Sequence, residues 1–229
     1  MQFGRNNPKA EYFMNGEKLS ESDTERDIGV TISNNLKLSK QCSEAARKAN
    51  SVLGMITKAF HYRDRHVFIN LDKQYVRPHL EFCSPAWSPW TQADINCLEH
   101  IQQRAVRLVS GLRSQDYKDR LQELKLLSLK DRRIKTDMIT TYTILYGFDR
   151  VDSSTWFKQI NQTRRTRLNA DPANLESSFS RTEIRRNFFS IRVPDIWNKL
   201  PAHVKSSTSI NMFKSRYDEY LCTRTVAAI

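Results

Sequence analysis

The segment from Arg77 to Trp90, which reads RPHLEFCSPAWSPW, constrains the fold more than any other part of the chain. Its prolines and tryptophans are Pro78, Pro85, Pro89, Trp87 and Trp90. Proline fixes φ, removes a backbone donor and restricts the residue before it, so the segment is predicted not to form one smooth helix. A basic, amphipathic stretch follows directly, over residues 91–111. We therefore predict a rigid aromatic joint, then a long helix, with the rest of the chain packed on them.

Composition favours a helical and basic protein. Only 6 of 229 residues are glycine, and Leu, Lys, Arg and Glu, which are good helix formers, are frequent. We predict a mainly α fold, with an N-terminal β-hairpin and short strands before a helical bundle and a helical C-terminal extension. The formal net charge of +12 suggests a polyanionic partner such as nucleic acid. The alternative is a basic soluble protein without such a partner.

Strand signals are confined to the N-terminal residues. Asn15-Gly16 separates two short runs, Glu11–Met14 and Glu17–Leu19, and this dipeptide is typical of a tight β-hairpin turn. The run Ile28–Ile32 is rich in β-branched residues and is predicted to form a further strand. An exposed edge in this region would allow the chain to associate with a second copy.

Apolar residues at helical spacing predict most of the remaining elements. Predicted helices cover 39–60 with Ser39 as its cap, 65–76, 91–111, 116–124 and 128–147. Capping boxes formed by Thr91 with Asp94 and by Ser128 with Asp131 begin two of these helices. Near the C-terminus, an extended piece follows Phe188 and Phe189, a helical turn begins at Pro194, Ser209 caps a last helix, and residues 223–229 are expected to fray.

Signatures of common catalytic sites are absent from the sequence. The histidines show no paired-ligand spacing, and no nucleotide-binding glycine loop or Gly-x-Ser-x-Gly elbow occurs. The chain also lacks an Asp-Asp pair for two-metal chemistry, so we expect no metal and no cofactor. The cysteines form no CxxC motif and are interpreted as reduced thiols of an intracellular protein, nuclear or cytoplasmic, and no apolar run is long enough for a membrane span.

Clusters of arginine and lysine are the positive signal. Arginine suits phosphate because its planar fork can bind two oxygens at once. The alternative for each of these basic side chains is that it lies on a solvated helix face. For the tryptophans, core or interface packing is favoured over base stacking. The candidate nucleic-acid-binding residues are Arg47, Lys48, Lys58, Arg104, Arg107, Arg113, Arg132, Arg133, Lys135, Arg164, Arg165 and Arg167.

Six ordered segments carry a resemblance to a known family. They read MQFGRNNPKAEYFMNG, DIGVTISNNLKLSKQC, VRPHLEFCSPAWSPW, IQQRAVRLVSGLR, LQELKLLSLKDRRIKTDMITTYTILYG and FFSIRVPDIWNKLPAHV. Together they resemble the C-terminal part of the reverse transcriptase, an RNA-directed DNA polymerase, of jockey-like non-LTR retrotransposons. In one departure, Arg165 and Thr166 stand where the family usually has Gly-His.

The resemblance implies a role for each part of the chain. The family's catalytic palm, with its aspartates and magnesium ions, lies upstream of the part that this chain resembles. Asp27, Ile28, Gly29 and Val30 resemble the primer grip, and the helices that follow resemble the thumb. The implied regions are 1–36 (end of the palm, primer-grip-like), 37–114 (thumb-like), 115–160 (helical extension), 161–183 (polar basic loop), 184–222 (aromatic and helical) and 223–229 (tail).

These inferences predict a truncated polymerase fragment that is not an enzyme by itself. Its expected role is sequence-independent binding of RNA or RNA–DNA duplex. One alternative is a non-enzymatic helical module for protein–protein interaction, with the proline–tryptophan joint as the partner site. Another is a transposon relic without a retained function.

Overall fold

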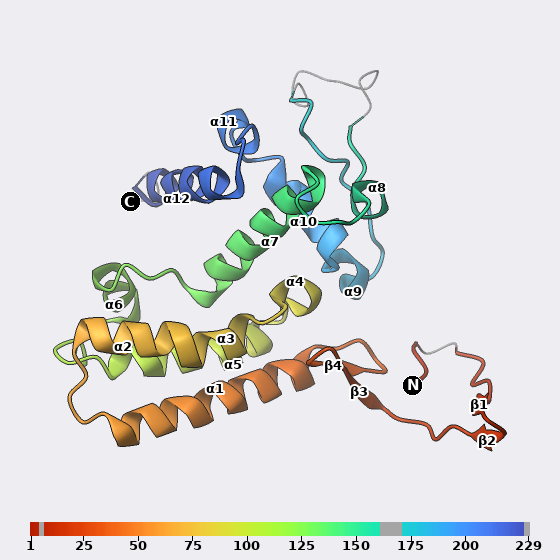
Figure 1. Ribbon diagram of the computed structural model, residues 1–229, viewed down its shortest axis with the longest axis horizontal. Helices are drawn as coiled ribbons and strands as arrows, with labels where there is room; N and C mark the ends of the chain where they lie inside the picture. Colours follow the sequence, from red (N-terminus) through yellow and green to blue (C-terminus); the bar gives the residue numbers. More distant parts are fainter. Residues whose placement is uncertain (5–6, 161–170, 227–229) are drawn as a thin grey trace. The chain divides into compact units, whose positions relative to one another are not determined.

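The structure is a computed structural model that describes residues 1–4, 7–160 and 171–226 (Figure 1). It is mainly helical, with small antiparallel hairpins near the N-terminus, which confirms the predicted fold class. The chain divides into two compact units, Met1–Arg132 (unit 1) and Arg133–Ile229 (unit 2). Each unit has its own cluster of buried apolar side chains, so each is described separately.

Two hairpins form the β structure of unit 1. β1 (Phe13–Met14) pairs with β2 (Glu17–Lys18), and both turn residues, Asn15 and Gly16, have positive φ as the tight turn requires. β3 (Thr24–Asp27) pairs with β4 (Val30–Ser33). The predicted strand at 28–32 therefore begins two residues late, because Ile28 and Gly29 form a second positive-φ turn. β3 was not predicted, since the polar sequence TERD carries no strand signal.

The long helix α1 (Ser39–Ala59) confirms the predicted helix at 39–60. Its cap differs from the prediction, because the N-cap residue is Leu38 and the Ser39 hydroxyl instead donates to Asp94. Apolar side chains such as Ala49 and Leu53 face the core of unit 1. Val30 of β4 is part of the same cluster, so the second hairpin packs on α1.

The second predicted helix, at 65–76, continues further than expected. α2 (Arg65–Leu71) passes into the π-helical segment η1 (Asp72–Val76) and then into α3 (Arg77–Glu81). Pro78 lacks an N–H, and its ring would clash with the carbonyl of residue 74 in a regular α-helix. The wider turn of η1, closed by the Arg77 N–H on the Asp72 carbonyl, accommodates this proline without ending the helix.

The joint breaks at Cys83 rather than at its first proline. Cys83 has a φ of 53°, which turns the chain before the short helix α4 (Ser84–Trp87). α5 (Gln92–Arg107) then begins at the predicted capping box, where the Asp94 N–H donates to the Thr91 hydroxyl at 3.2 Å. α5 ends at Arg107, so the predicted helix at 91–111 is shorter by four residues at its C-terminal end.

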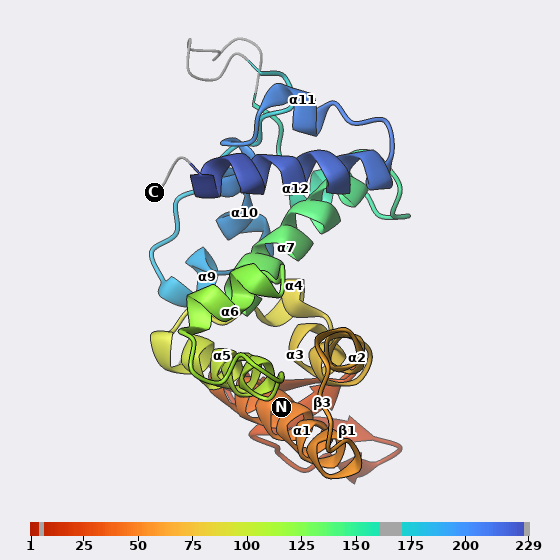
Figure 2. The ribbon, with the colours of Figure 1, turned by 90° about the vertical axis from the view of Figure 1, so that its left-hand side faces the viewer.

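Figures 1 and 2 show α1 and α5 side by side in unit 1. α6 (Tyr117–Glu123) confirms the predicted helix at 116–124 and packs on α5. The predicted helix at 128–147 is α7 (Leu129–Leu145), and the Ser128 hydroxyl accepts the Asp131 N–H at 3.1 Å as its capping box requires. The division between the units falls within the first half of α7.

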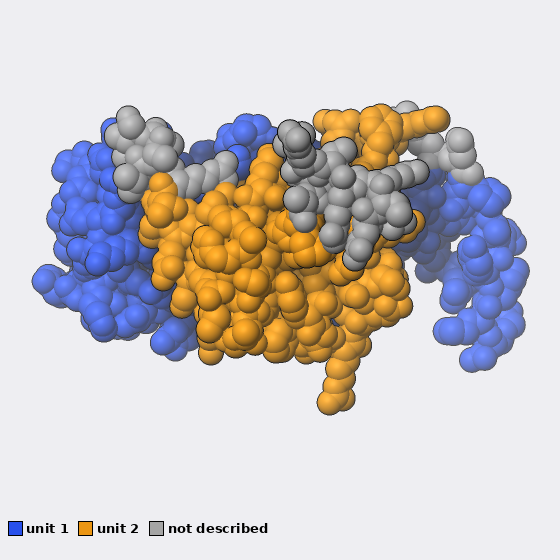
Figure 3. Space-filling model, turned by 90° about the horizontal axis from the view of Figure 1, so that it is seen from above, with its two compact units in different colours: residues 1–132 blue, residues 133–229 orange. Residues whose placement is uncertain are grey.

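Unit 2 is orange in Figure 3, and its long helices α7 and α12 (Ile210–Val226) and several short helices pack around an aromatic core. After α7 come α8 (Ser153–Trp156), α9 (Glu183–Arg186), α10 (Phe189–Trp197), α11 (Ala202–Lys205) and α12. The extended piece predicted after Phe189 is wrong, because α10 is already helical there and contains Pro194. The prediction that the chain frays from residue 223 is also wrong for residues 223–226, because α12 continues to Val226.

Candidate nucleic-acid interface

The helices α1 and α5 run parallel, and two side-chain hydrogen bonds fix their register. Near their N-termini, the Ser39 hydroxyl donates to Asp94 at 3.1 Å. About three turns further along both helices, Arg104 donates to the Asn50 side chain at 2.7 Å. The residue numbers of the two bonded pairs differ by 55 and 54, and this nearly equal offset shows that the helices run in the same direction. Exposed side chains at matching levels of the two helices therefore form one surface.

The carboxylates of α1 and α5 are all engaged within the protein. Glu44 accepts the Thr31 hydroxyl at 2.7 Å, and half-buried Glu99 accepts the Tyr117 hydroxyl. Asp94 is buried and accepts the hydroxyls of Thr91 and Ser39. The exposed residues of both helices consequently include no acidic side chain. This leaves the exposed charge of the surface entirely positive.

Besides Lys40, which donates to the Thr24 hydroxyl at 2.6 Å, five exposed cations lie on or next to this surface, and we call these five the basic strip. They are Arg47, Lys58, Arg104, Arg107 and Arg113. Arg47 lies three residues before Asn50, so Arg104 and Arg47 are close across the seam of the two helices. In the part of the chain that the structure describes, the salt bridges involve none of these five residues. No acidic side chain of the described residues pairs with their charge.

A hollow of about 370 Å³ opens beside the strip, between α5 and α6. We call it the arginine hollow, and its lining residues are His100, Gln103, Arg104, Arg107, Tyr117 and Arg120. Arg120 reaches it from α6 and donates to the carbonyl of Leu112 at 2.9 Å and of Arg113 at 3.2 Å. Sequence reasoning missed Arg120 and His100. Arg120 directly follows Asp119, so only the packing of α6 on α5 places it among the other cations.

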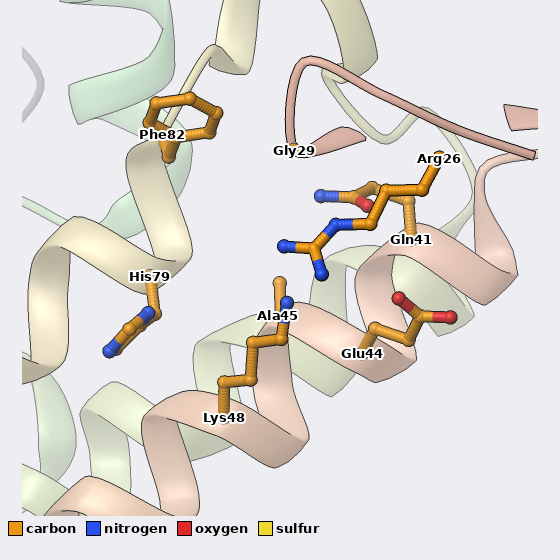
Figure 4. A pocket seen from close by; sticks show the side chains of 8 residues that line it. All are labelled: Arg26, Gly29, Gln41, Glu44, Ala45, Lys48, His79 and Phe82. Atoms are coloured by element: carbon orange, nitrogen blue, oxygen red, sulfur yellow. The ribbon is translucent and has the colours of Figure 1, made fainter. Parts of the chain in front are cut away.

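A second hollow, of about 250 Å³, lies where the β3–β4 turn meets α1 and α3. Figure 4 shows Arg26 and Lys48 extending into it from the hairpin and from α1, with His79 and Phe82 on the α3 side. Lys48, predicted as a phosphate contact, thus belongs to this hollow and not to the basic strip. Arg26 and His79 were not predicted as site residues, because they lie far apart in the sequence. Only the packing of the second hairpin beside α3 places both of them at this hollow.

The primer-grip-like residues form the tip of the second hairpin. A hydrogen bond attaches this hairpin to α1, since the Gln41 side chain accepts the Thr31 N–H at 2.8 Å. At the tip, a Cβ on Gly29 would lie 3.1 Å from the Phe82 ring, so the turn contacts the end of α3 closely. Ile28 is 84% exposed, Asp27 is exposed, and Val30 turns into the core.

The cations at the start of α7 are engaged by acidic side chains. Arg132 pairs with Glu81 in unit 1, and in unit 2 Lys135 pairs with Asp218. Arg133 is buried beside Asp137, four residues along the same helix. Burial raises the pKa of Asp137, while Arg192 and Arg133 oppose that rise. We therefore leave these three cations out of the candidate interface.

Other predictions are placed as follows. Arg164, Arg165 and Arg167 lie outside the described residues. Within the described ranges, no group of His, Cys, Asp or Glu side chains is arranged to hold a metal ion. Likewise, none of the helices described there is both long and apolar enough to cross a bilayer. Trp87, with 1% exposure, and Trp197, with 0%, are core residues as favoured, whereas Trp90 is half-buried and Trp156 is 37% exposed.

Comparison with known proteins yields no relative: no protein-family model, curated protein or solved structure matches this chain. The resemblance to a retrotransposon reverse transcriptase therefore stays a prediction.

Proposed function

We propose that this chain binds RNA or RNA–DNA duplex through its phosphates, without reading base sequence, as the thumb and C-terminal region of a jockey-like retrotransposon reverse transcriptase. The observation that carries the proposal is the charge separation on α1 and α5. Their carboxylates are hydrogen-bonded within the protein, while all their arginines and lysines except the half-buried Lys48 are exposed. A surface of this kind attracts a polyanion and presents no exposed acidic side chain to it.

The dimensions of the basic strip suit a duplex backbone. Arg47 and Lys58 are eleven positions apart on α1, which corresponds to about 16 Å along the helix. Double-stranded DNA carries a phosphate about every 3.4 Å of its axis on each strand, and at this spacing about five phosphates of one strand span this length. The strip holds five cations, about one for each of these phosphates. Long Arg and Lys side chains can also follow a curved backbone.

The proposal predicts a steep dependence of affinity on salt. Neutralising about five phosphates releases about five condensed counterions, so log affinity should fall with log salt at a slope of about −4.5. Fluorescence anisotropy on labelled RNA–DNA hybrids of two unrelated sequences measures this slope and the sequence dependence together. We expect similar affinities and similar slopes for both hybrids. Absence of binding at low salt, or binding without a salt slope, would refute the proposal.

Exposed apolar residues favour self-association as a second candidate function. Tyr12, Phe13 and Met14 are each 62–63% exposed on the first hairpin, which consists of only two short strands. Such a hairpin gains stability by pairing with another strand. Size-exclusion chromatography before and after nuclease treatment distinguishes the candidates. Oligomers that survive the nuclease support self-association through the hairpin, and oligomers that dissociate support assembly on nucleic acid.

A further inference from the structure

The arginine hollow differs from the basic strip in shape and in the convergence of its charges. The strip follows the exposed faces of α1 and α5, whereas the hollow is an open concavity of about 370 Å³ between α5 and α6. Three guanidinium groups, on Arg104, Arg107 and Arg120, line it from two elements, with His100 beside them. No carboxylate is among its lining residues. A concave group of cations of this kind suits a compact anion better than a long backbone.

Most of the donors in the hollow are available to a ligand. Arg107 makes no ion pair or side-chain hydrogen bond with the residues that the structure describes. Arg104 donates from one terminal nitrogen, to Asn50. Arg120 donates from Nε and Nη2 to two backbone carbonyls, which fixes its position and leaves its Nη1 group for a ligand. One fixed guanidinium and two adaptable ones therefore face the hollow.

Tyr117, which lines the hollow, contacts the Glu99 carboxylate that lies behind it. Its hydroxyl donates to Glu99, and the Glu99 carboxylate also accepts the Leu129 N–H at 3.3 Å. Burial, followed by the Glu99 hydrogen bond, raises the pKa of Tyr117, so its hydroxyl stays neutral at physiological pH. The wall that Tyr117 contributes is thus uncharged.

We propose that the arginine hollow binds a phosphate monoester, and that nucleic-acid ends carrying a terminal phosphate are thereby preferred over hydroxyl ends. The preference for ends rests on the function proposed above, while binding of the monoester itself does not. A phosphate monoester carries nearly two negative charges at neutral pH and offers three strong acceptor oxygens, against a single charge on a backbone diester. The strip and the hollow share Arg104 and Arg107, and a terminal phosphate that enters the hollow reaches Arg120 as well. The second charge and the third free oxygen of the monoester then distinguish it from a backbone diester.

The test compares one RNA–DNA hybrid with a 5′-phosphate or a 5′-hydroxyl at its ends. For the unaltered chain we expect about tenfold tighter binding of the phosphorylated hybrid, the effect of one or two charge-assisted hydrogen bonds. Arg107→Gln should abolish this ratio. The matched control is Arg47→Gln, which removes the same charge from the strip outside the hollow. It should weaken binding of both hybrids equally and leave the ratio unchanged. Equal affinity of the unaltered chain for both hybrids overturns the proposal, as does a ratio that survives Arg107→Gln.

A second measurement separates this proposal from the duplex-binding function. Inorganic phosphate and a nucleoside 5′-monophosphate are titrated alone, by calorimetry, into the unaltered chain and into both variants. Binding that is lost in Arg107→Gln and kept in Arg47→Gln supports the hollow even if no duplex binds. It also shows whether the monoester must be attached to nucleic acid. If the monoester binds equally well without Arg107, it binds outside the arginine hollow, and the proposal is overturned.

Discussion

Substituting Trp87 tests whether the proline–tryptophan joint is core or contact surface. The indole is 1% exposed within the core of unit 1, and its Nε1–H donates to the Phe82 carbonyl at 2.6 Å. Trp87→Ala removes the packed ring and leaves a cavity, at a cost of about 3–5 kcal/mol in the free energy of unfolding. Trp87→Phe keeps most of the ring but leaves the carbonyl without its donor, at a cost of about 1–2 kcal/mol.

Hydrogen exchange measures this cost locally, which suits a chain with two compact units. For Trp87→Ala, amides in α1 and α5 should exchange faster by about two to four orders of magnitude, and for Trp87→Phe by about one. Trp156→Ala is the control, because Trp156 is 37% exposed and belongs to unit 2. It should leave exchange in α1 and α5 unchanged. A change below about tenfold for Trp87→Ala, together with weaker binding of nucleic acid, would make the ring a stacking residue and refute the packing argument.

Three further substitutions test other parts of the account. Gly29→Ala should destabilise the second hairpin by about 1–2 kcal/mol, because its φ is +83° and the new Cβ would meet the Phe82 ring at 3.1 Å; unchanged chemical shifts around Phe82 would contradict this. Thr91→Ala should lower the urea midpoint by the equivalent of about 1 kcal/mol through loss of the α5 cap, and no change in midpoint would refute the cap's role. The pKa of Asp137 is raised in the folded chain, so between pH 3.8 and that raised pKa the folded chain holds a proton that the unfolded chain has lost. The free energy of unfolding should therefore fall as pH rises from 3.8 to the raised pKa. Urea midpoints measured across that window should show the fall, and Asp137→Asn should remove it; the same slope in the variant would contradict the assignment.

Helices with strong local signals were predictable from the sequence. The capping boxes at Thr91 and Ser128 and the apolar stripe of α1 located three helix starts correctly or within one residue. Predictions failed where tertiary packing overrides a local rule. Pro78 and Pro194 were expected to break or begin helices, but a π turn accommodates the first and α10 contains the second.

The candidate interface was only partly predictable, because charge in a sequence does not reveal which charges pair. Arg132 and Lys135 resemble Arg104 and Arg107 in local sequence, yet Glu81 and Asp218 engage the first two from distant positions. Arg120 shows the converse case, since its own helix is mixed in charge and only its packing beside α5 adds it to the hollow. Which cations remain exposed is therefore a property of the fold.

The most direct test of the account is the salt slope of duplex binding when the basic strip is neutralised. The triple variant Arg47→Gln, Arg104→Gln, Arg107→Gln removes three cations, so the slope should become shallower by about 2.7. The matched control neutralises Arg181, Arg185 and Arg186, which are three exposed arginines of unit 2. We predict that the control keeps a slope of about −4.5 on the RNA–DNA hybrid, whereas the strip variant falls to about −2. Equal slopes for the two variants would contradict the assignment of nucleic-acid binding to α1 and α5.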